Sequence, residues 1–188
     1  MKAEKRIIDS GQLKSLWSSL TGKIINDYPT LSNLAVVGVR CRGDILAARM
    51  VEEVKRITGK SLPLGILDIT LYRDDFTMIG PEPVVRKTEI NFDIQDKEVI
   101  LVDDVIFTGR TTRAALDELI DFGRPTSICL AVLIDRGGRE LPIQPDYVGK
   151  RVTINPGEIV EVRLEEFDGK DEVVVTERKL KERKKHKF

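Results

Sequence analysis

Residues 99–112, VILVDDVIFTGRTT, constrain the fold more than any other stretch of the chain. The run Val99–Val102 is apolar without interruption, which is typical of a strand buried on both faces of a parallel sheet. Asp103 and Asp104 follow, and a short loop of small and hydroxylated residues then leads into a helical pattern that stops at Gly123. We therefore predict a buried strand, a loop and a helix whose N-terminus faces that loop.

The predicted loop has the chemistry of a phosphate site. Free N–H groups at a helix N-terminus attract anions, Gly109 allows the backbone to approach closely, and Thr108, Thr111 and Thr112 supply hydroxyl donors. The two carboxylates would repel a bare phosphate, so we expect them to face sugar hydroxyls or a magnesium ion through water. Together these groups describe a ribose 5-phosphate site. For the aspartate pair alone, an acidic solvent-exposed turn is the alternative.

Composition and charge indicate one domain with a separate tail. The 188 residues are enough to bury a real core, and no apolar run reaches the roughly 18 residues of a membrane span. Residues 178–188 hold seven of the 31 Lys and Arg and one of the 31 Asp and Glu, which leaves 24 basic against 30 acidic residues in the body. We predict a single domain over residues 1–177 and a basic, disordered tail over 178–188.

The two cysteines bear on the compartment. Cys41 and Cys129 lie far apart in unrelated sequence contexts, which is not the pattern of a disulfide framework. The N-terminus is charged on both signs and lacks the apolar core of a signal peptide. These features predict a reducing, cytoplasmic location.

The remaining chain repeats the strand–loop–helix plan. We predict a helix in residues 1–30, a second helix that starts at an Asp44 N-cap and ends at Gly59, and strands at 34–39, 64–69, 127–134, 147–154, 159–164 and 172–176. This alternation predicts an α/β fold, a mainly parallel sheet flanked by helices on both faces. The loops at the strands' carboxyl ends then gather at one edge, where ligands bind in such sheets.

One of these loops, Arg40–Gly43, places two guanidiniums beside a predicted helix N-terminus. Arginine forms forked hydrogen bonds with phosphate oxygens, so the loop suits a diphosphate. A solvated basic turn is the alternative interpretation.

Residues 99–112 resemble the phosphoribosyl-diphosphate (PRPP) motif of the type I phosphoribosyltransferases. Within that superfamily, Asp68–Asp75, Ile100–Asp104 and Asp135–Ile143 are most similar to the PyrR group. That group combines a uracil phosphoribosyltransferase with a regulator of pyrimidine operons that binds messenger RNA leaders. The resemblance implies the type I phosphoribosyltransferase fold, with a small hood and a β-arm or flexible loop.

The resemblance also implies an activity and its residues. Uracil and PRPP would react to give UMP and diphosphate. Mg²⁺ would bind together with PRPP, and water molecules would connect it to Asp103 and Asp104. It assigns PRPP and UMP binding to Cys41, Arg42, Val105, Ile106, Phe107, Thr108, Gly109, Arg110 and Thr111. It assigns catalysis to Asp103, Asp104 and Arg73, with Arg86 and Lys87 as weaker candidates in the same flexible segment.

The acceptor base would meet the loop Asp135–Pro142, with Arg136 reaching the base or the diphosphate. For RNA, the resemblance leaves Arg139, Lys150 and Arg151 as candidate phosphate contacts, to which the basic tail could add salt-sensitive affinity. The group's members form a homodimer or a higher homo-oligomer. Three hypotheses remain: an enzyme that also regulates RNA, an enzyme without RNA binding, and an RNA-binding regulator that uses the site as a nucleotide sensor.

Overall fold

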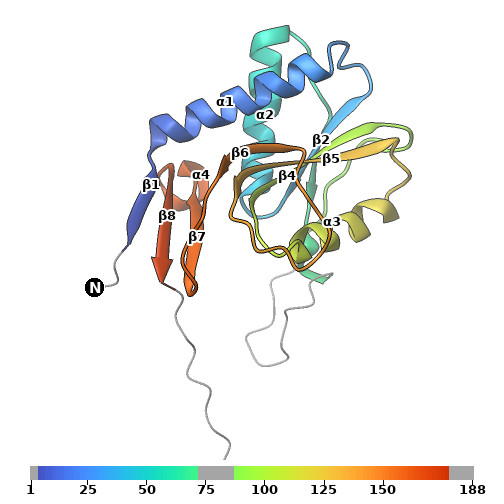
Figure 1. Cartoon of the computed structure of the whole chain (residues 1–188). Helices are drawn as coiled ribbons and strands as arrows, with labels where there is room; N and C mark the ends of the chain where they lie inside the picture. Colours follow the sequence, from blue (N-terminus) through green and yellow to red (C-terminus); the bar gives the residue numbers. More distant parts are fainter. Residues whose placement is uncertain (1–3, 72–86, 178–188) are drawn as a thin grey trace, which may run out of the picture.

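Five parallel strands form the central sheet of the chain, shown in Figure 1 as a computed structural model that describes residues 4–71 and 87–177. The strand order is β3-β2-β4-β5-β6, and each neighbouring pair is parallel. The strands are β2 (Leu34–Val39), β3 (Leu64–Leu67), β4 (Glu98–Ile106), β5 (Ser127–Asp135) and β6 (Tyr147–Arg151). The predicted α/β architecture is confirmed.

Helices cover both faces of this sheet. The helices α1 (Ser10–Asp27) and α2 (Gly43–Thr58) bury their apolar side chains in one core with residues of β2, β4 and β5. The helix α3 (Arg110–Asp121) packs on the opposite face in a second core. Both faces of the central strands are therefore buried, as their apolar sequence requires.

A small antiparallel sheet forms a hood beside the central sheet (Figure 1). Its order is β1-β8-β7, with β1 (Lys5–Ile8), β7 (Glu158–Arg163) and β8 (Glu172–Glu177). The short helix α4 (Glu165–Asp168) connects β7 to β8. The strand β1 was not predicted, because two basic and two apolar residues give no periodic signal and the strand exists only through its pairing with β8.

Several boundaries differ from the prediction. The strand expected at 99–102 continues to Ile106, because β4 stays paired with β5 as far as Asp135, so both aspartates lie within the strand. The strand expected at 64–69 ends at Leu67 and a 3₁₀ turn, η1 (Ile69–Leu71), follows. Similarly, β6 ends at Arg151.

The predicted Asp44 N-cap is wrong. The helix α2 begins at Gly43 with Arg42 as its N-cap, and Asp44 lies in the first turn. The helix starts early because Gly43 lies directly against β4, where a Cβ atom would be 2.5 Å from the carbonyl oxygen of Val102 and 3.1 Å from the Cα of Asp103. Only glycine permits this approach, which holds the loop before α2 beside the acidic end of β4.

Within residues 4–71 and 87–177, no helix is both long and apolar enough to cross a membrane. Two predicted segments lie outside the described residues. They are the tail at 178–188 and most of the flexible segment, residues 72–86. Beyond that segment, Glu89 pairs with Ile66 in an antiparallel bridge. The single domain over 1–177 stays a prediction.

We expect Gly43→Ala to lower the free energy of unfolding by about 1–3 kcal/mol, the usual cost of forcing an extra methyl group into a packed contact. Urea unfolding followed by circular dichroism measures the change. Gly22→Ala in α1 is the matched control, because nothing lies within 4 Å of its added Cβ. That variant should gain about 0.5–1 kcal/mol from helix propensity. Equal stability of Gly43→Ala and the wild type would contradict the close contact.

Candidate active site

Two adjacent carboxylates mark the carboxyl-terminal half of β4. Asp103 is buried, and its Oδ1 accepts the amide N–H of Asp104 at 2.9 Å, while Oδ1 of Asp104 accepts that of Val105 at 2.8 Å. Burial raises the pKa of Asp104 above its usual value, and the charge of Arg42 opposes that rise. Asp104 therefore depends on nearby positive charge to stay ionised.

The loop after β4 opens onto the start of α3. Gly109 is the N-cap of that helix at a φ of 92°, a left-handed conformation that strongly favours glycine. Gly109 has no side chain with which to cap the first-turn amides of α3, and a helix N-terminus of this kind can meet an anion. Thr108 Oγ1 accepts the Arg110 amide at 3.3 Å within this loop. The structure brings together the residues of the predicted anion site, which stays a prediction.

The loop that follows β5 is tied to this phosphate loop. The carbonyl oxygen of Thr108 accepts the amides of Glu140 at 2.9 Å and Leu141 at 3.1 Å. Arg110 Nε also lies 2.8 Å from Glu140 Oε2. The two loops therefore form one hydrogen-bonded unit at the carboxyl edge of β4 and β5.

A buried ion pair organises the loop after β5. Arg139 donates to Asp135 Oδ1 at 2.8 Å, to the carbonyl oxygen of Phe107 at 3.0 Å and to that of Ile143 at 3.0 Å. Burial alone would raise the pKa of Asp135, but the Gly137 amide and Arg139 more than offset it, so that pKa lies below its ordinary value. The side chain of Arg139, predicted as a candidate RNA contact, is 12% exposed and is held in this network.

Phe107 and Arg136 stack at the same edge. The guanidinium carbon of Arg136 lies 3.5 Å from the centroid of the Phe107 ring, and the phenylalanine side chain is 39% exposed. A flat aromatic ring backed by a cation offers a stacking surface at a site predicted to take a planar base.

The loop before α2 is anchored to the hood. Arg42 donates from Nε and Nη2 to the two carboxylate oxygens of Asp168, at 3.0 and 2.8 Å. Cys41 is exposed beside it. The peptide bond between Arg40 and Cys41 is cis, and Arg40 pairs with Glu89 at 3.2 Å. Arg42 was predicted to face a diphosphate, and its side chain already has a carboxylate partner within the chain.

The structure places the predicted residues in three groups. The carboxyl edge of the sheet holds Cys41, Arg42, Asp103, Asp104, Phe107, Thr108, Gly109, Arg110, Thr111 and Arg136. Val105 and Ile106 belong to β4 rather than to the loop, since they pair with Ile134 and Asp135. Lys150 and Arg151 lie on β6, where Arg151 Nε is 3.6 Å from Asp135 Oδ2, while Arg73 and Arg86 fall outside the described residues. Lys87 is described and exposed.

Sequence reasoning missed two features of this region. Asp168 lies 126 positions from Arg42, so no local motif announces their pair. Thr88 donates to the buried carboxylate of Glu118 in α3 and accepts the amide of Asp68 at 3.0 Å. A threonine and a glutamate 30 positions apart likewise carry no sequence signal.

Comparisons with known proteins place this geometry in a family. The phosphoribosyl transferase domain family model matches residues 5–166. The Bifunctional protein PyrR of Pelotomaculum thermopropionicum is 52% identical over 178 residues, covering 94% of this chain and 98% of that protein. The Bifunctional protein PyrR of Thermus thermophilus is 47% identical over 178 residues, covering 95% and 98%.

The chain belongs to the PyrR family of phosphoribosyltransferases. Solved structures agree on the fold: the hypoxanthine phosphoribosyltransferase of Trypanosoma cruzi has a TM-score of 0.71 at 19% identity, covering 94% of this chain and 98% of that chain. That of Staphylococcus aureus has a TM-score of 0.66 at 19% identity and covers 93% of each. The predicted phosphoribosyltransferase fold and the predicted PyrR membership are both confirmed.

We expect Asp135→Asn to destabilise this PyrR family member by about 1–3 kcal/mol at pH 7, because Arg139 loses a buried charged partner. A carboxylate with a lowered pKa stabilises the fold above its unfolded pKa, near 3.8, and loses this contribution as the pH falls through its folded pKa. The difference between variant and wild type should therefore shrink below about pH 4. Urea unfolding at pH 7 and pH 3 measures it, and a difference that does not depend on pH would contradict the ion pair.

Proposed function

We propose that the chain is a uracil phosphoribosyltransferase that also binds messenger RNA leaders in response to uridine nucleotides. The observation that carries the enzyme half is the acidic end of β4 beside the uncapped start of α3. A carboxylate pair and an anion site one loop apart match the two ends of a ribose 5-phosphate.

The proposed reaction moves ribose 5-phosphate from PRPP to a ring nitrogen of uracil. The C1–O bond to diphosphate breaks as the C1–N bond forms, and positive charge grows on the ribose in the transition state. Asp103 and Asp104 hold the ribose hydroxyls and stabilise this charge, while the loop 107–111 holds the 5-phosphate. Arg42 and the loop before α2 meet the leaving diphosphate. Catalysis is then positioning and electrostatic stabilisation.

Uracil recognition is assigned to the loop after β5. The network of Asp135 and Arg139 fixes this loop's backbone, so its N–H and C=O groups can match the polar edge of a uracil. The exposed Phe107 ring, backed by Arg136, supplies an apolar face for the planar base.

Magnesium is proposed to enter with PRPP. Asp103 and Asp104 are hard oxygen donors of the kind Mg²⁺ prefers, and they would contact it through water. When bound, the ion neutralises the diphosphate charge. Within residues 4–71 and 87–177, no group of three or more His, Cys, Asp or Glu side chains is arranged to hold a metal.

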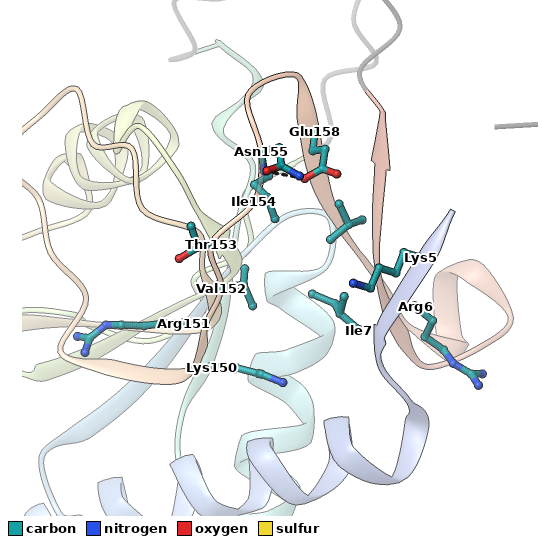
Figure 2. A pocket seen from close by; sticks show the side chains of 11 residues that line it. Lys5, Arg6, Ile7, Lys150, Arg151, Val152, Thr153, Ile154, Asn155 and Glu158 are labelled. Atoms are coloured by element: carbon teal, nitrogen blue, oxygen red, sulfur yellow. Dashed lines mark hydrogen bonds between the residues drawn. The ribbon is translucent and has the colours of Figure 1, made fainter. Parts of the chain in front are cut away.

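A basic hollow between β1 and β6 supports the RNA half. Figure 2 shows Lys5 and Lys150 pointing into it from opposite walls, over an apolar floor that includes Val152 and Ile154. The hollow measures about 590 Å³, and neither lysine has an ion-pair partner among the described residues. Its lining holds four cationic residues, the two lysines with Arg6 and Arg151, and a single carboxylate, Glu158. The side chains of Arg6 and Arg151 point away from the hollow (Figure 2), and Arg151 Nε lies 3.6 Å from Asp135 Oδ2. Residues 1–177 carry a net negative charge, whereas this hollow is positively charged. A positively charged surface suits the phosphodiester backbone of RNA.

The two other hypotheses remain as alternatives. A phosphoribosyltransferase without RNA binding would show turnover but no affinity for leader RNA. A sensor would bind UMP and RNA without turning over PRPP. We also propose a cytoplasmic location, supported by the free state of both Cys41 and Cys129. A homodimer or higher homo-oligomer likewise stays a prediction.

We expect diphosphate release from PRPP and Mg²⁺ with uracil, and none with orotate, hypoxanthine, guanine or adenine. Asp104→Asn should lower kcat about 10²–10³-fold, because a group facing the transition-state charge is lost. Asp117→Asn, an exposed carboxylate on α3, is the control and should leave kcat unchanged. Turnover with a purine would contradict the substrate assignment. No turnover with UMP binding retained would favour the sensor.

We expect the double variant Lys150→Ala with Arg151→Ala to bind a structured pyr leader RNA more weakly. The slope of log K against log salt should fall by about one for each lost phosphate contact. Lys55→Ala with Arg56→Ala, an adjacent pair at the end of α2, is the matched control. Filter binding over a salt series, with and without UMP, measures both effects. Equal slopes for the two double variants would rule out β6 as the RNA contact, and RNA affinity that UMP does not change would rule out regulation of that RNA.

A further inference from the structure

The ion pair between Arg42 and Asp168 connects the loop before α2 to the hood. Its two hydrogen bonds use the Nε and Nη2 atoms of the guanidinium, at 3.0 and 2.8 Å, in the bidentate geometry that fixes an arginine most firmly. The ring of Phe167 lies under the guanidinium, 5.2 Å from its central carbon. Both partners are largely shielded, with side chains 24% and 15% exposed.

Both ends of this pair are themselves anchored. The Oδ2 atom of Asp168 also accepts the amide of Leu164 at 2.9 Å, which ties the carboxylate to the start of α4. Arg42 is the N-cap of α2, and its carbonyl oxygen accepts the amide of Leu46 at 3.0 Å. The Arg42 hydrogen bond lowers the pKa of Asp168, so the aspartate stays charged at neutral pH. The guanidinium is therefore held between two rigid elements.

We propose that Asp168 is a positioning residue that orients the guanidinium of Arg42 toward the diphosphate of PRPP. The inference rests on the proposed function and adds to it a residue that touches no substrate. With Nε and one N–H of Nη2 occupied, Nη1 forms no hydrogen bond with a described residue and offers its N–H donors to a phosphate oxygen.

Two effects of Asp168 oppose each other. Its negative charge reduces the attraction of Arg42 for an anion. Its two hydrogen bonds fix the rotamer of Arg42 before the ligand arrives. The entropy that a flexible arginine side chain would lose on binding diphosphate is therefore already lost in the free protein. We take the ordering effect to be the larger one, because the Leu164 amide holds the carboxylate in place and so fixes the guanidinium as well. The ordering of Arg42 therefore dominates, and removal of Asp168 weakens diphosphate binding.

The chain offers a matched control in the pair Arg49–Asp171. Arg49 lies two turns after Arg42 on α2 and forms hydrogen bonds of 2.9 and 2.7 Å with the carboxylate of Asp171. Asp171 also accepts a backbone amide, that of Glu165, at 2.8 Å. This pair joins the same helix to the same segment but contains no residue of the loop at 40–43. Arg49 also donates to both carboxylate oxygens of Glu166, at 2.9 and 2.6 Å, so the control removes Glu166 and Asp171 together. It reports the structural cost of losing such a pair without the positioning effect.

The test is isothermal titration of the full-length chain with magnesium diphosphate and, separately, with UMP. Asp168→Ala should weaken diphosphate binding about five- to tenfold, the scale of one charge-assisted contact, and should raise KM for PRPP more than it changes kcat. UMP carries no diphosphate, so its affinity should change less than about twofold. The double variant Glu166→Ala with Asp171→Ala should leave diphosphate affinity unchanged while losing a similar amount of thermal stability. In an Arg42→Ala background, Asp168→Ala should have no further effect.

Asp168→Asn keeps an acceptor and removes the charge, so its affinity should lie between those of the wild type and Asp168→Ala. Tighter diphosphate binding by Asp168→Asn would overturn the proposal in favour of a competing counter-ion. Unchanged binding by Asp168→Ala, or an equal loss in the Arg42→Ala background, would overturn it as well. If the wild type binds neither PRPP nor diphosphate, the proposed function itself fails. If the wild type binds both ligands and Asp168→Ala binds diphosphate as tightly as the wild type, the proposed function stands and only the positioning role of Asp168 is overturned.

Discussion

The parallel pairing of β4 between β2 and β5 is the constraint on which the rest of the site depends. Parallel strands deliver their carboxyl ends to one edge, and here that edge receives the loop before α2, the acidic end of β4 and the loop after β5. The buried pairing of β4 continues through both aspartates to Ile106. Two charged side chains are thus held on a rigid strand rather than on a mobile turn, which suits groups that must stabilise a short-lived charge.

The features of this fold that depend on neighbouring residues were predictable from the sequence. Apolar runs located the central strands, and the change from apolar run to Asp-Asp, glycine and threonines located the anion site. Gly59 marked the end of α2, where it adopts a φ of 73°. These signals are local, because propensity, burial and backbone geometry act on neighbouring residues.

The parts that depend on distant residues were not predictable. No local signal announced Asp168 as the partner of Arg42, or the three acceptors around the guanidinium of Arg139. In both cases the side-chain type was read correctly and its partner was missing. The strand β1 failed for the same reason, since only β8 makes it a strand.

The shared carbonyl of Thr108 has a consequence for how the two halves of the site communicate. This oxygen belongs to the phosphate loop, yet it accepts two amides from the loop after β5. A movement that separates these loops must break both hydrogen bonds, so the conformations of the two loops are linked. Such linkage is reciprocal by thermodynamic necessity. The conformations of the loop after β4 and of the loop after β5 are therefore coupled through one backbone oxygen.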